Sequence, residues 1–255
     1  MHDTPPNVAR RLFAEFLGTG LLVTVVVGSG IAAQRLSPNN VGLQLLENST
    51  ATAFGLAVLI LMFGPVSGAH FNPVVSLADC FLDRRARAGL RPTEVGAYTV
   101  AQCVGGIGGA VLANVMFDAG QHLSTKHRVT AGHLVGEIVA TAGLIALIFA
   151  LARTRRTALA APAIGAYIGA AYWFTRSTAY ANPAVTIRRM FTDTFAGIAP
   201  SSAPSFIGTQ IIGGAVGVSI VLALYPNAGQ RAGDVVTPQT LTDTNTHHRS
   251  VQAPT

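Results

Sequence analysis

Two Asn-Pro dipeptides, each embedded in apolar sequence, constrain the fold of this chain more than any other feature. They are Asn72-Pro73 and Asn182-Pro183. Asparagine is a favoured N-cap residue and proline is favoured at the first helical position, so each dipeptide is typical of a helix start. A single Asn-Pro more often marks only a turn. However, irregular backbone within a membrane is tolerated only where it is buried in protein or lines a water-filled cavity. The pair therefore predicts two helix starts beside a pore.

These two helix starts would give the pore a positive lining that donates hydrogen bonds. Each helix N-terminus carries about +0.5 elementary charge, and each asparagine side chain offers amide donors. A polar neutral solute can accept hydrogen bonds from such donors, whereas a cation or a proton is repelled by two positive helix ends. The pattern predicts a pathway for small uncharged solutes.

The composition indicates a membrane protein that crosses the bilayer several times. Half of the 255 residues are hydrophobic, 11% are charged, and the mean hydropathy is +0.45. The net charge of +6 could indicate nucleic-acid binding, but the basic residues lie between apolar runs and are typical of topology signals. The two cysteines, Cys80 and Cys103, have no metal-type spacing. We therefore expect no nucleic-acid partner, no metal and no cofactor.

Six apolar runs are each close to the roughly 20 residues that a helix needs to cross the hydrocarbon. They cover residues 12–33, 49–67, 95–117, 132–152, 159–178 and 204–225. The Asn-Pro dipeptides follow the second and fifth runs, and each leads into a piece too short to span, residues 73–82 and 183–192. We predict an all-α membrane protein with six transmembrane helices and two re-entrant half-helices.

The basic residues predict the orientation of these spans. If the N-terminus is inside, the inner segments hold most of the arginines, and cytoplasmic loops are the ones enriched in Lys and Arg. The inner arginines are Arg10, Arg11, Arg84, Arg85, Arg87, Arg91, Arg153, Arg155, Arg156, Arg231 and Arg249. We predict a cytoplasmic N-terminus (residues 1–10), a channel domain (11–226) and a disordered cytoplasmic tail (227–255), with both termini cytoplasmic in a bacterial cytoplasmic membrane.

An internal repeat divides the channel domain into halves at about 11–118 and 132–226. Three pairs of segments match in the same order: Ala14–Thr19 with Gly136–Thr141, Asn72-Pro73 with Asn182-Pro183, and Ala101-Gln102 with Thr209-Gln210. Each half contains three spans, which is an odd number, so the second half must be inverted relative to the first. The two half-helices should therefore enter from opposite faces and meet at the midplane.

Two glutamates, Glu15 and Glu137, occupy matching positions within spans, where an unpaired carboxylate is expensive. One interpretation makes them ion or proton ligands. The other is that each accepts hydrogen bonds from the irregular loop of its own half and holds that loop in place. Their duplication favours the brace, and we include His70 among the loop-bracing residues.

The chain resembles the major intrinsic protein family, the aquaporins and aquaglyceroporins, over residues from about 10 to 225. The resemblance depends on Ala14–Thr19, Ser67–Val74, Ala101-Gln102 and Asn182–Ala184. It implies six spans and two half-helices per protomer, a pore in every protomer and a homotetramer. It also implies that Asn72-Pro73-Val74 and Asn182-Pro183-Ala184 are the pore motifs, with both asparagines donating to solute and water. Val74 departs from the alanine usual in the first motif.

A second departure concerns the selectivity filter that the resemblance implies. Most family members have arginine directly after the second motif, where this chain has Val185. An ungapped count from the two asparagines puts the other filter positions at Thr52, Ala170 and Ala179. Replacing arginine by valine removes a bulky side chain, five donors and a fixed charge. We therefore expect a wide, uncharged and mostly apolar constriction that passes solutes larger than water.

Arg188 and Arg189 follow Val185 by three and four residues, which places them on about the same helix face. One hypothesis is that they restore positive charge in the outer vestibule. The alternative is that both face loop carbonyls or an acidic partner such as Asp193.

Residues 182–187 and 191–200 are similar to a bacterial branch of the family associated with arsenic resistance. This likeness suggests metalloid acids such as arsenite, or methylated arsenicals, as solutes beside glycerol-like polyols and water. The rival functions are an orthodox water or glycerol facilitator, an ion-coupled secondary transporter that would need Glu15 or Glu137 as an ion site, and a structural or adhesive protein. The sequence has no pattern typical of a nucleophile with its base, so we predict a channel rather than an enzyme.

Overall fold

The computed structural model describes residues 6–82 and 89–226. The predicted disordered tail, residues 227–255, lies outside the described residues. So do residues 1–5 of the predicted N-terminal segment and the arginines at positions 84, 85, 87, 231 and 249.

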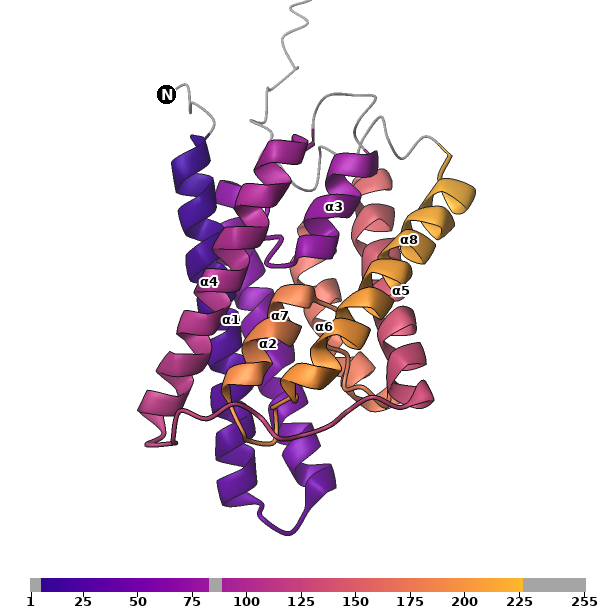
Figure 1. Ribbon diagram of the computed structural model, residues 1–255. Helices are drawn as coiled ribbons and strands as arrows, with labels where there is room; N and C mark the ends of the chain where they lie inside the picture. The colour runs from indigo at the N-terminus through magenta and orange to yellow at the C-terminus, as the bar shows by residue number, and fades with distance from the viewer. Residues whose placement is uncertain (1–5, 83–88, 227–255) are drawn as a thin grey trace, which may run out of the picture.

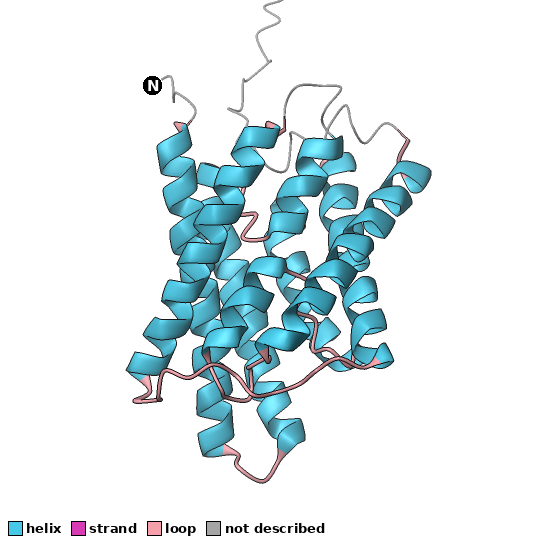
Figure 2. Cartoon of the chain, viewed as in Figure 1, coloured by secondary structure: helices cyan, strands magenta, loops and turns pink. Residues whose placement is uncertain are grey.

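Eight α-helices and three 3₁₀ turns make up the secondary structure of the described residues, and no strand occurs among them (Figure 2). The six long helices are α1 (Val8–Leu36), α2 (Val41–Ser67), α4 (Pro92–Met116), α5 (Ala131–Arg153), α6 (Ala160–Phe174) and α8 (Ala203–Leu224). All six are long and apolar enough to cross a membrane, α6 and α8 together with the 3₁₀ turns that precede them. The predicted all-α class with six spans is confirmed.

Two short helices interrupt this pattern where the Asn-Pro dipeptides predicted them. They are α3 (Pro73–Leu82) and α7 (Pro183–Arg188), the latter continued by a 3₁₀ turn at Arg189–Phe191. In Figure 1, α3 points from the middle of the bundle toward the face at which α1 begins, called here the N-terminal face. Helix α7 points from the middle toward the opposite face. The two half-helices are thus inverted relative to each other, as the odd number of spans per half requires.

The hairpin between α1 and α2 is longer than the apolar runs predicted and projects beyond the other helices on the opposite face (Figure 1). Helix α2 begins at Val41, eight residues before the predicted run at 49–67. The side chain of Asn40 caps it by accepting a hydrogen bond from the Leu43 N–H at 2.9 Å. The first two turns carry Gln44, Glu47 and Asn48, so a hydropathy criterion alone misses helix that lies past the apolar run.

Helices pack in the same way in the two halves of the repeat. Helix α1 packs against α4 and α2, and α5 packs against α8 and α6. Glycines bring the backbones together: a Cβ on Gly109 of α4 would lie 2.0 Å from the Gly20 carbonyl oxygen of α1. A Cβ on Gly217 of α8 would lie 2.6 Å from the Ala142 carbonyl oxygen of α5. Small residues at such contacts let helices approach closely in lipid.

The α1–α4 contact supplies a prediction with a matched control. Gly109→Ala should destabilise the protein by about 1–3 kcal/mol, because the new methyl group meets backbone that has to shift. Gly108→Ala lies one residue away with open space around its added Cβ, and should leave stability unchanged or slightly raised. Thermal unfolding of the two variants in one detergent measures the difference; equal melting temperatures would contradict close packing at Gly109.

Candidate functional site

The two Asn-Pro loops meet in the middle of the bundle and are joined there by their asparagines. Asn72 Nδ2 donates to the Ala181 carbonyl at 2.8 Å, and Asn182 Nδ2 donates to the Phe71 carbonyl at 2.7 Å. The side-chain oxygen of Asn72 accepts from the Val74 N–H at 2.9 Å, which caps the first half-helix. Each asparagine therefore fixes its own helix start and also the residue that precedes the other asparagine.

The loops that carry the asparagines have an unusual backbone. Ala69 and Phe71 have φ of 50° and 49°, and Ala179 and Ala181 have φ of 46° and 48°. Non-glycine residues in this left-handed region cost on the order of 1–3 kcal/mol each and persist only when the surroundings hold them. The same alternation in both halves indicates that the surrounding contacts, rather than local preference, determine the loop conformation.

Glu15 and Glu137 supply much of that hold. Glu15 accepts hydrogen bonds from the backbone N–H groups of His70 (3.0 Å) and Phe71 (2.8 Å), from Ser67 Oγ (2.7 Å) and from Gln102 Nε2 (2.7 Å). His70 Nδ1 lies 2.9 Å from Ser76 Oγ, a residue of α3, so its ring also ties the loop to the half-helix. The Nε2 atom of His70 is buried without a hydrogen-bond partner among the described residues.

The second half repeats this arrangement. Glu137 accepts hydrogen bonds from the backbone N–H groups of Tyr180 and Ala181, both at 2.9 Å, and from Gln210 Nε2. Thr186 takes the place of Ser76, with its hydroxyl donating to the Asn182 carbonyl at 3.1 Å. Both glutamates are fully buried. Their oxygens thus accept from the loop backbone of their own half.

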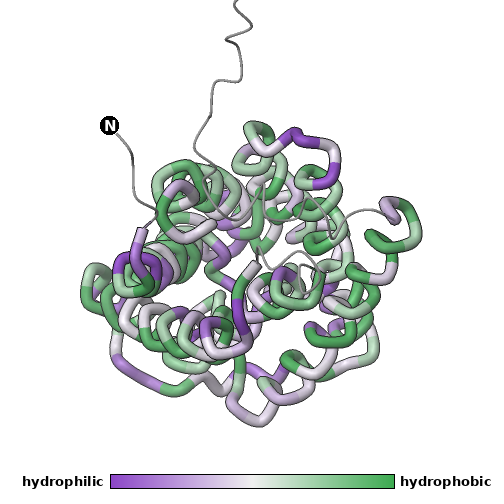
Figure 3. Tube along the Cα trace, turned by 90° about the horizontal axis from the view of Figure 1, so that it is seen from above, coloured by the Kyte–Doolittle hydropathy of each residue, from purple (hydrophilic) through white to green (hydrophobic). Residues whose placement is uncertain are grey.

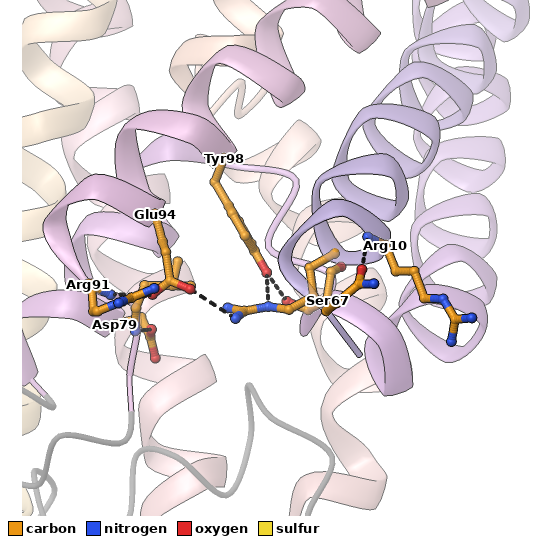
Figure 4. Close-up of polar contacts among 9 residues, drawn as sticks. Arg10, Ser67, Asp79, Arg91, Glu94 and Tyr98 are labelled. Atoms are coloured by element: carbon orange, nitrogen blue, oxygen red, sulfur yellow. Dashed lines mark hydrogen bonds and ion pairs between the residues drawn. The ribbon is translucent and has the colours of Figure 1, made fainter. Parts of the chain in front are cut away.

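The first brace extends to the N-terminal face through Tyr98 of α4 (Figure 4). The Tyr98 hydroxyl donates to the Ser67 carbonyl at 3.0 Å and accepts from Arg11 Nε at 2.9 Å. Arg11 also pairs with Glu94 at 3.1 Å, and Glu94 pairs with Arg91 at 3.2 Å. The first loop is therefore anchored to the starts of α1 and α4.

The role of the braces can be tested by a nearly isosteric change. Glu137→Gln places an amide nitrogen where a carboxylate oxygen accepts from the loop backbone, so one N–H donor meets another donor. We expect a loss of about 1–3 kcal/mol in unfolding free energy, measured by thermal or denaturant unfolding in detergent. Glu47→Gln is the control, because Glu47 is half-buried and accepts a hydrogen bond from Ser37 Oγ near the hairpin tip. An equal effect of the two changes would contradict the brace.

A cavity of about 910 Å³ passes both Asn-Pro loops. Its lining extends from Arg155 and Thr157, which follow α5 at the N-terminal face, to Arg188 and Arg189 toward the opposite face. Between these ends it is lined by Asn72, Asn182 and the loop residues beside them, and by apolar side chains from four helices: Leu22, Val26, Leu56, Ile60, Leu144, Ile148, Ala161, Ile164 and Ile168. Seen along the bundle axis, the helices are arranged around the middle of the bundle (Figure 3).

The predicted filter residues fall into two groups in this cavity. Thr52, Ala179 and Val185 line it, whereas Ala170 is exposed on the outer side of α6 and is not part of the lining. On this part of α6 it is Tyr172 that lines the cavity, with its hydroxyl 3.3 Å from Thr52 Oγ1. Ala170 and Tyr172 are two residues apart, which corresponds to a rotation of about 200° around an α-helix. The ungapped count from Asn182 therefore selects the face of α6 opposite to the one that lines the cavity.

Arg188 and Arg189 also line the cavity. Neither forms an ion pair with Asp193 in the described part of the chain. The Asp193 carboxylate accepts from the Thr125 backbone N–H at 2.9 Å and from the Ser124 and Thr125 hydroxyls. The hydrogen bond from the Thr125 N–H lowers the pKa of Asp193 from its usual value, so the carboxylate is ionised at neutral pH. This contact ties residues 118–130 to the loop after α7 at the opposite face.

Comparisons with known proteins agree with this architecture. The family model named major intrinsic protein matches residues 3–177. Aquaglyceroporin AqpS of Rhizobium meliloti (strain 1021) is 44% identical over 216 residues, which cover 84% of this chain and 90% of that protein. Aquaporin-1 of Rhizopus delemar is 32% identical over 130 residues, 48% of this chain and 40% of that protein. The solved aquaglyceroporin structure from Plasmodium falciparum shares the fold, with a TM-score of 0.57, 18% identity, and coverage of 86% and 96% of the respective chains.

Proposed function

The chain belongs to the major intrinsic protein family, a family of membrane channels, and from this premise we propose that it is a passive channel for small uncharged solutes and water with a widened selectivity filter. The observation that carries the proposal is the cavity that passes both asparagines and has Val185 in its wall. Val185 offers no charge and no donor, and pore selectivity depends on diameter, lining donors and electrostatic barriers. A channel of this kind performs no covalent chemistry.

The solutes that suit this lining are compact neutral molecules with several hydroxyl groups. Asn72 and Asn182 present amide groups at the centre of the cavity, and Thr52 and Tyr172 present hydroxyls toward the opposite face. The lining also holds polar or charged residues at and between its two ends, among them His70, Arg155, Thr157, Arg188 and Arg189, and most of the remaining side chains are apolar. Glycerol-like polyols fit this description. Arsenous acid, the neutral form of arsenite at pH 7, resembles glycerol in size and hydroxyl display, and methylated arsenicals add an apolar surface. The similarity to an aquaglyceroporin supports this class over water alone.

We further propose that four copies assemble as a homotetramer in a bacterial cytoplasmic membrane, with both termini cytoplasmic. This orientation follows from the count of basic residues over the full sequence, which is higher in the segments on the N-terminal side. Of these residues, Arg10, Arg11, Arg91, Arg153 and Arg155 lie at the N-terminal face. The opposite face, with the α1–α2 hairpin, would then be outside. Exposed apolar residues on the long helices suit lipid and neighbouring protomers.

The rival functions are less well supported. An ion-coupled transporter would need a coupling-ion site, but Glu15 and Glu137 are engaged with loop backbone and Gln102 or Gln210. A structural or adhesive function does not require a cavity whose lining extends from one face of the bundle toward the other. An orthodox water or glycerol facilitator remains the alternative within the channel class, and it differs from our proposal in the width of the filter.

The decisive experiment is stopped-flow light scattering on the purified protein in liposomes at neutral pH. An impermeant osmolyte measures water flux, and inward gradients of glycerol and arsenous acid measure solute flux. We expect rapid re-swelling with either solute, above that of empty liposomes and independent of a proton gradient. Fast water efflux without re-swelling would overturn the widened filter, and flux that saturates and follows a proton gradient would favour a coupled transporter.

A further inference from the structure

Two arginine side chains at the opposite-face end of the cavity have no protein counter-charge among the described residues. Arg188 has a relative exposure of 0% and Arg189 of 2%. Nε, Nη1 and Nη2 of Arg188 are all buried without a hydrogen-bond partner, and so is Nε of Arg189. Both residues nevertheless border the cavity. A buried guanidinium with all its nitrogens unpaired is expensive and calls for an explanation.

The neighbouring acidic and carbonyl groups do not supply the missing partner. Asp193 is held by Ser124 and Thr125. The two ion pairs of the described chain, Arg11–Glu94 and Arg91–Glu94, lie at the N-terminal face. Arg128 donates hydrogen bonds to the Gly197 and Phe195 carbonyls, at 2.7 and 2.8 Å, in the loop that follows α7. None of these groups forms a hydrogen bond with the side chain of Arg188.

The two side chains are held in place without being neutralised. The guanidinium carbon of Arg189 lies 3.8 Å from the centre of the Tyr180 ring, a cation–π contact. The stem of Arg188 packs against α4 at Gly106, where an added Cβ would lie 3.0 Å from Arg188 Cδ. Arg188 lies in the last turn of α7 and Arg189 is its C-cap residue, and the C-terminal carbonyls of a helix favour positive charge. The partial negative charge of a helix C-terminus does not replace hydrogen bonds from the three side-chain nitrogens of Arg188.

From these contacts we infer that Arg188 and Arg189 form a binding site for a small monovalent oxyanion of carboxylate type, at the end of the cavity that faces away from the N-terminal face. The planar fork of a guanidinium matches two oxygens of such an anion, and charge-assisted pairs of this kind are among the strong hydrogen bonds. The effect of this site on transport rests on the proposed channel function, because the bound ion would share the cavity with the conducted solutes. An ion seated there should obstruct them.

Binding can be measured without transport, so the site and the proposed function fail separately. The probe is sodium formate added to the detergent-purified protein, with sodium chloride at equal ionic strength as the comparison. A ligand that binds only the folded state raises the melting temperature in proportion to the logarithm of its concentration above Kd. We expect formate to stabilise the protein and chloride to do so much less. The two oxygens of formate match two parallel N–H donors of a guanidinium, whereas a spherical ion offers only one acceptor atom. Equal melting temperatures in the two salts would overturn the site.

The variants assign the effect to the arginines. Arg188→Met removes a buried unpaired charge, so it should melt at a higher temperature than the unmodified protein without formate and lose the response to formate. Arg188→Lys keeps the charge without the fork and should respond weakly. Arg176→Met is the matched control, an exposed arginine at the same face that does not line the cavity, and should respond fully. A full response in Arg188→Met would assign formate binding elsewhere and contradict the proposal.

Liposome flux supplies the last arm. External formate should slow glycerol re-swelling of the unmodified protein and leave Arg188→Met unaffected. If the unmodified protein shows no glycerol flux but formate still stabilises it, the proposed channel function fails while the oxyanion site stands. If glycerol flux is present and formate changes neither flux nor melting temperature, the channel function stands and the site fails.

Discussion

Val185→Arg is expected to cut glycerol permeability by about tenfold or more, which corresponds to a barrier raised by roughly 1.4 kcal/mol, while water permeability stays nearly unchanged. Val185 lines the cavity together with Thr52, Tyr172 and Ala179. Arginine adds a long side chain and five donors to this wall, which narrows the path for a three-carbon solute but still leaves donors for single-file water. Paired stopped-flow measurements of water efflux and glycerol re-swelling on the same liposomes give the ratio directly.

Val185→Leu is the control for this prediction, because it adds bulk without charge or donors. We expect it to reduce glycerol flux less than arginine does and to leave the rank of solutes unchanged. The proximity of Arg188 and Arg189 adds a further expectation, since a third guanidinium beside two unpaired ones is repelled and should lower the stability of Val185→Arg. Unchanged glycerol flux in a folded Val185→Arg protein would mean that residue 185 does not line the constriction.

The fold could be predicted from the sequence because its determinants are local and repeated. The sequence has six apolar runs of membrane-spanning length, two Asn-Pro helix starts and an odd number of spans per half. Together these features predict six spans with two oppositely directed half-helices, and the structure confirms this arrangement. Apart from the two starts that the Asn-Pro dipeptides predict, helix ends can be predicted only where apolar residues reach them. The α1–α2 hairpin extends beyond its apolar runs because capping by Asn40 and helix-forming polar residues continue it, and hydropathy does not record either effect.

The cavity wall could be predicted less completely, because it depends on which face of each helix points inward. The ungapped count from Asn182 predicts Ala170 in the filter, but such a count depends on the length of the loop between α6 and α7. The helical spacing of Ala161, Ile164, Ile168 and Tyr172, which all line the cavity, would have excluded Ala170. The helical periodicity of α6 therefore identifies the face that lines the cavity, which an ungapped count of residues from Asn182 does not.

The arginine pair shows a different limit of sequence reasoning. The spacing of Arg188 and Arg189 after Val185 indicated one helix face, but a sequence does not say whether an arginine has a partner. Asp193 follows Arg189 by only four residues, yet its carboxylate is hydrogen-bonded to Thr125 from a distant segment of the chain. Burial together with unpaired nitrogens is a property of the packed structure, and it is this property that turns two basic residues into a candidate site.

Asn182→Asp is expected to abolish solute flux, because it breaks the junction of the two loops. Asn182 Nδ2 donates to the Phe71 carbonyl at 2.7 Å, and in aspartate this nitrogen becomes an oxygen that faces another acceptor. The remaining oxygen can still cap α7 through the Ala184 N–H. The half-helix therefore persists while the loops separate, and a negative charge enters the middle of the cavity. Glycerol re-swelling should fall to the level of empty liposomes.

Two further variants distinguish this effect from general damage by a buried charge. Asn72→Asp should lose flux in the same way, since Asn72 makes the equivalent hydrogen bond to the Ala181 carbonyl at 2.8 Å. Asn114→Asp changes another buried asparagine, whose side chain contacts Gln121 and Phe191 outside the cavity lining. It should lower the melting temperature but leave glycerol flux per folded protein close to normal. If Asn182→Asp conducts glycerol at the unmodified rate, the asparagine donors are not needed for the pore; if Asn114→Asp abolishes flux as completely, the loss reports unfolding rather than the junction of the loops.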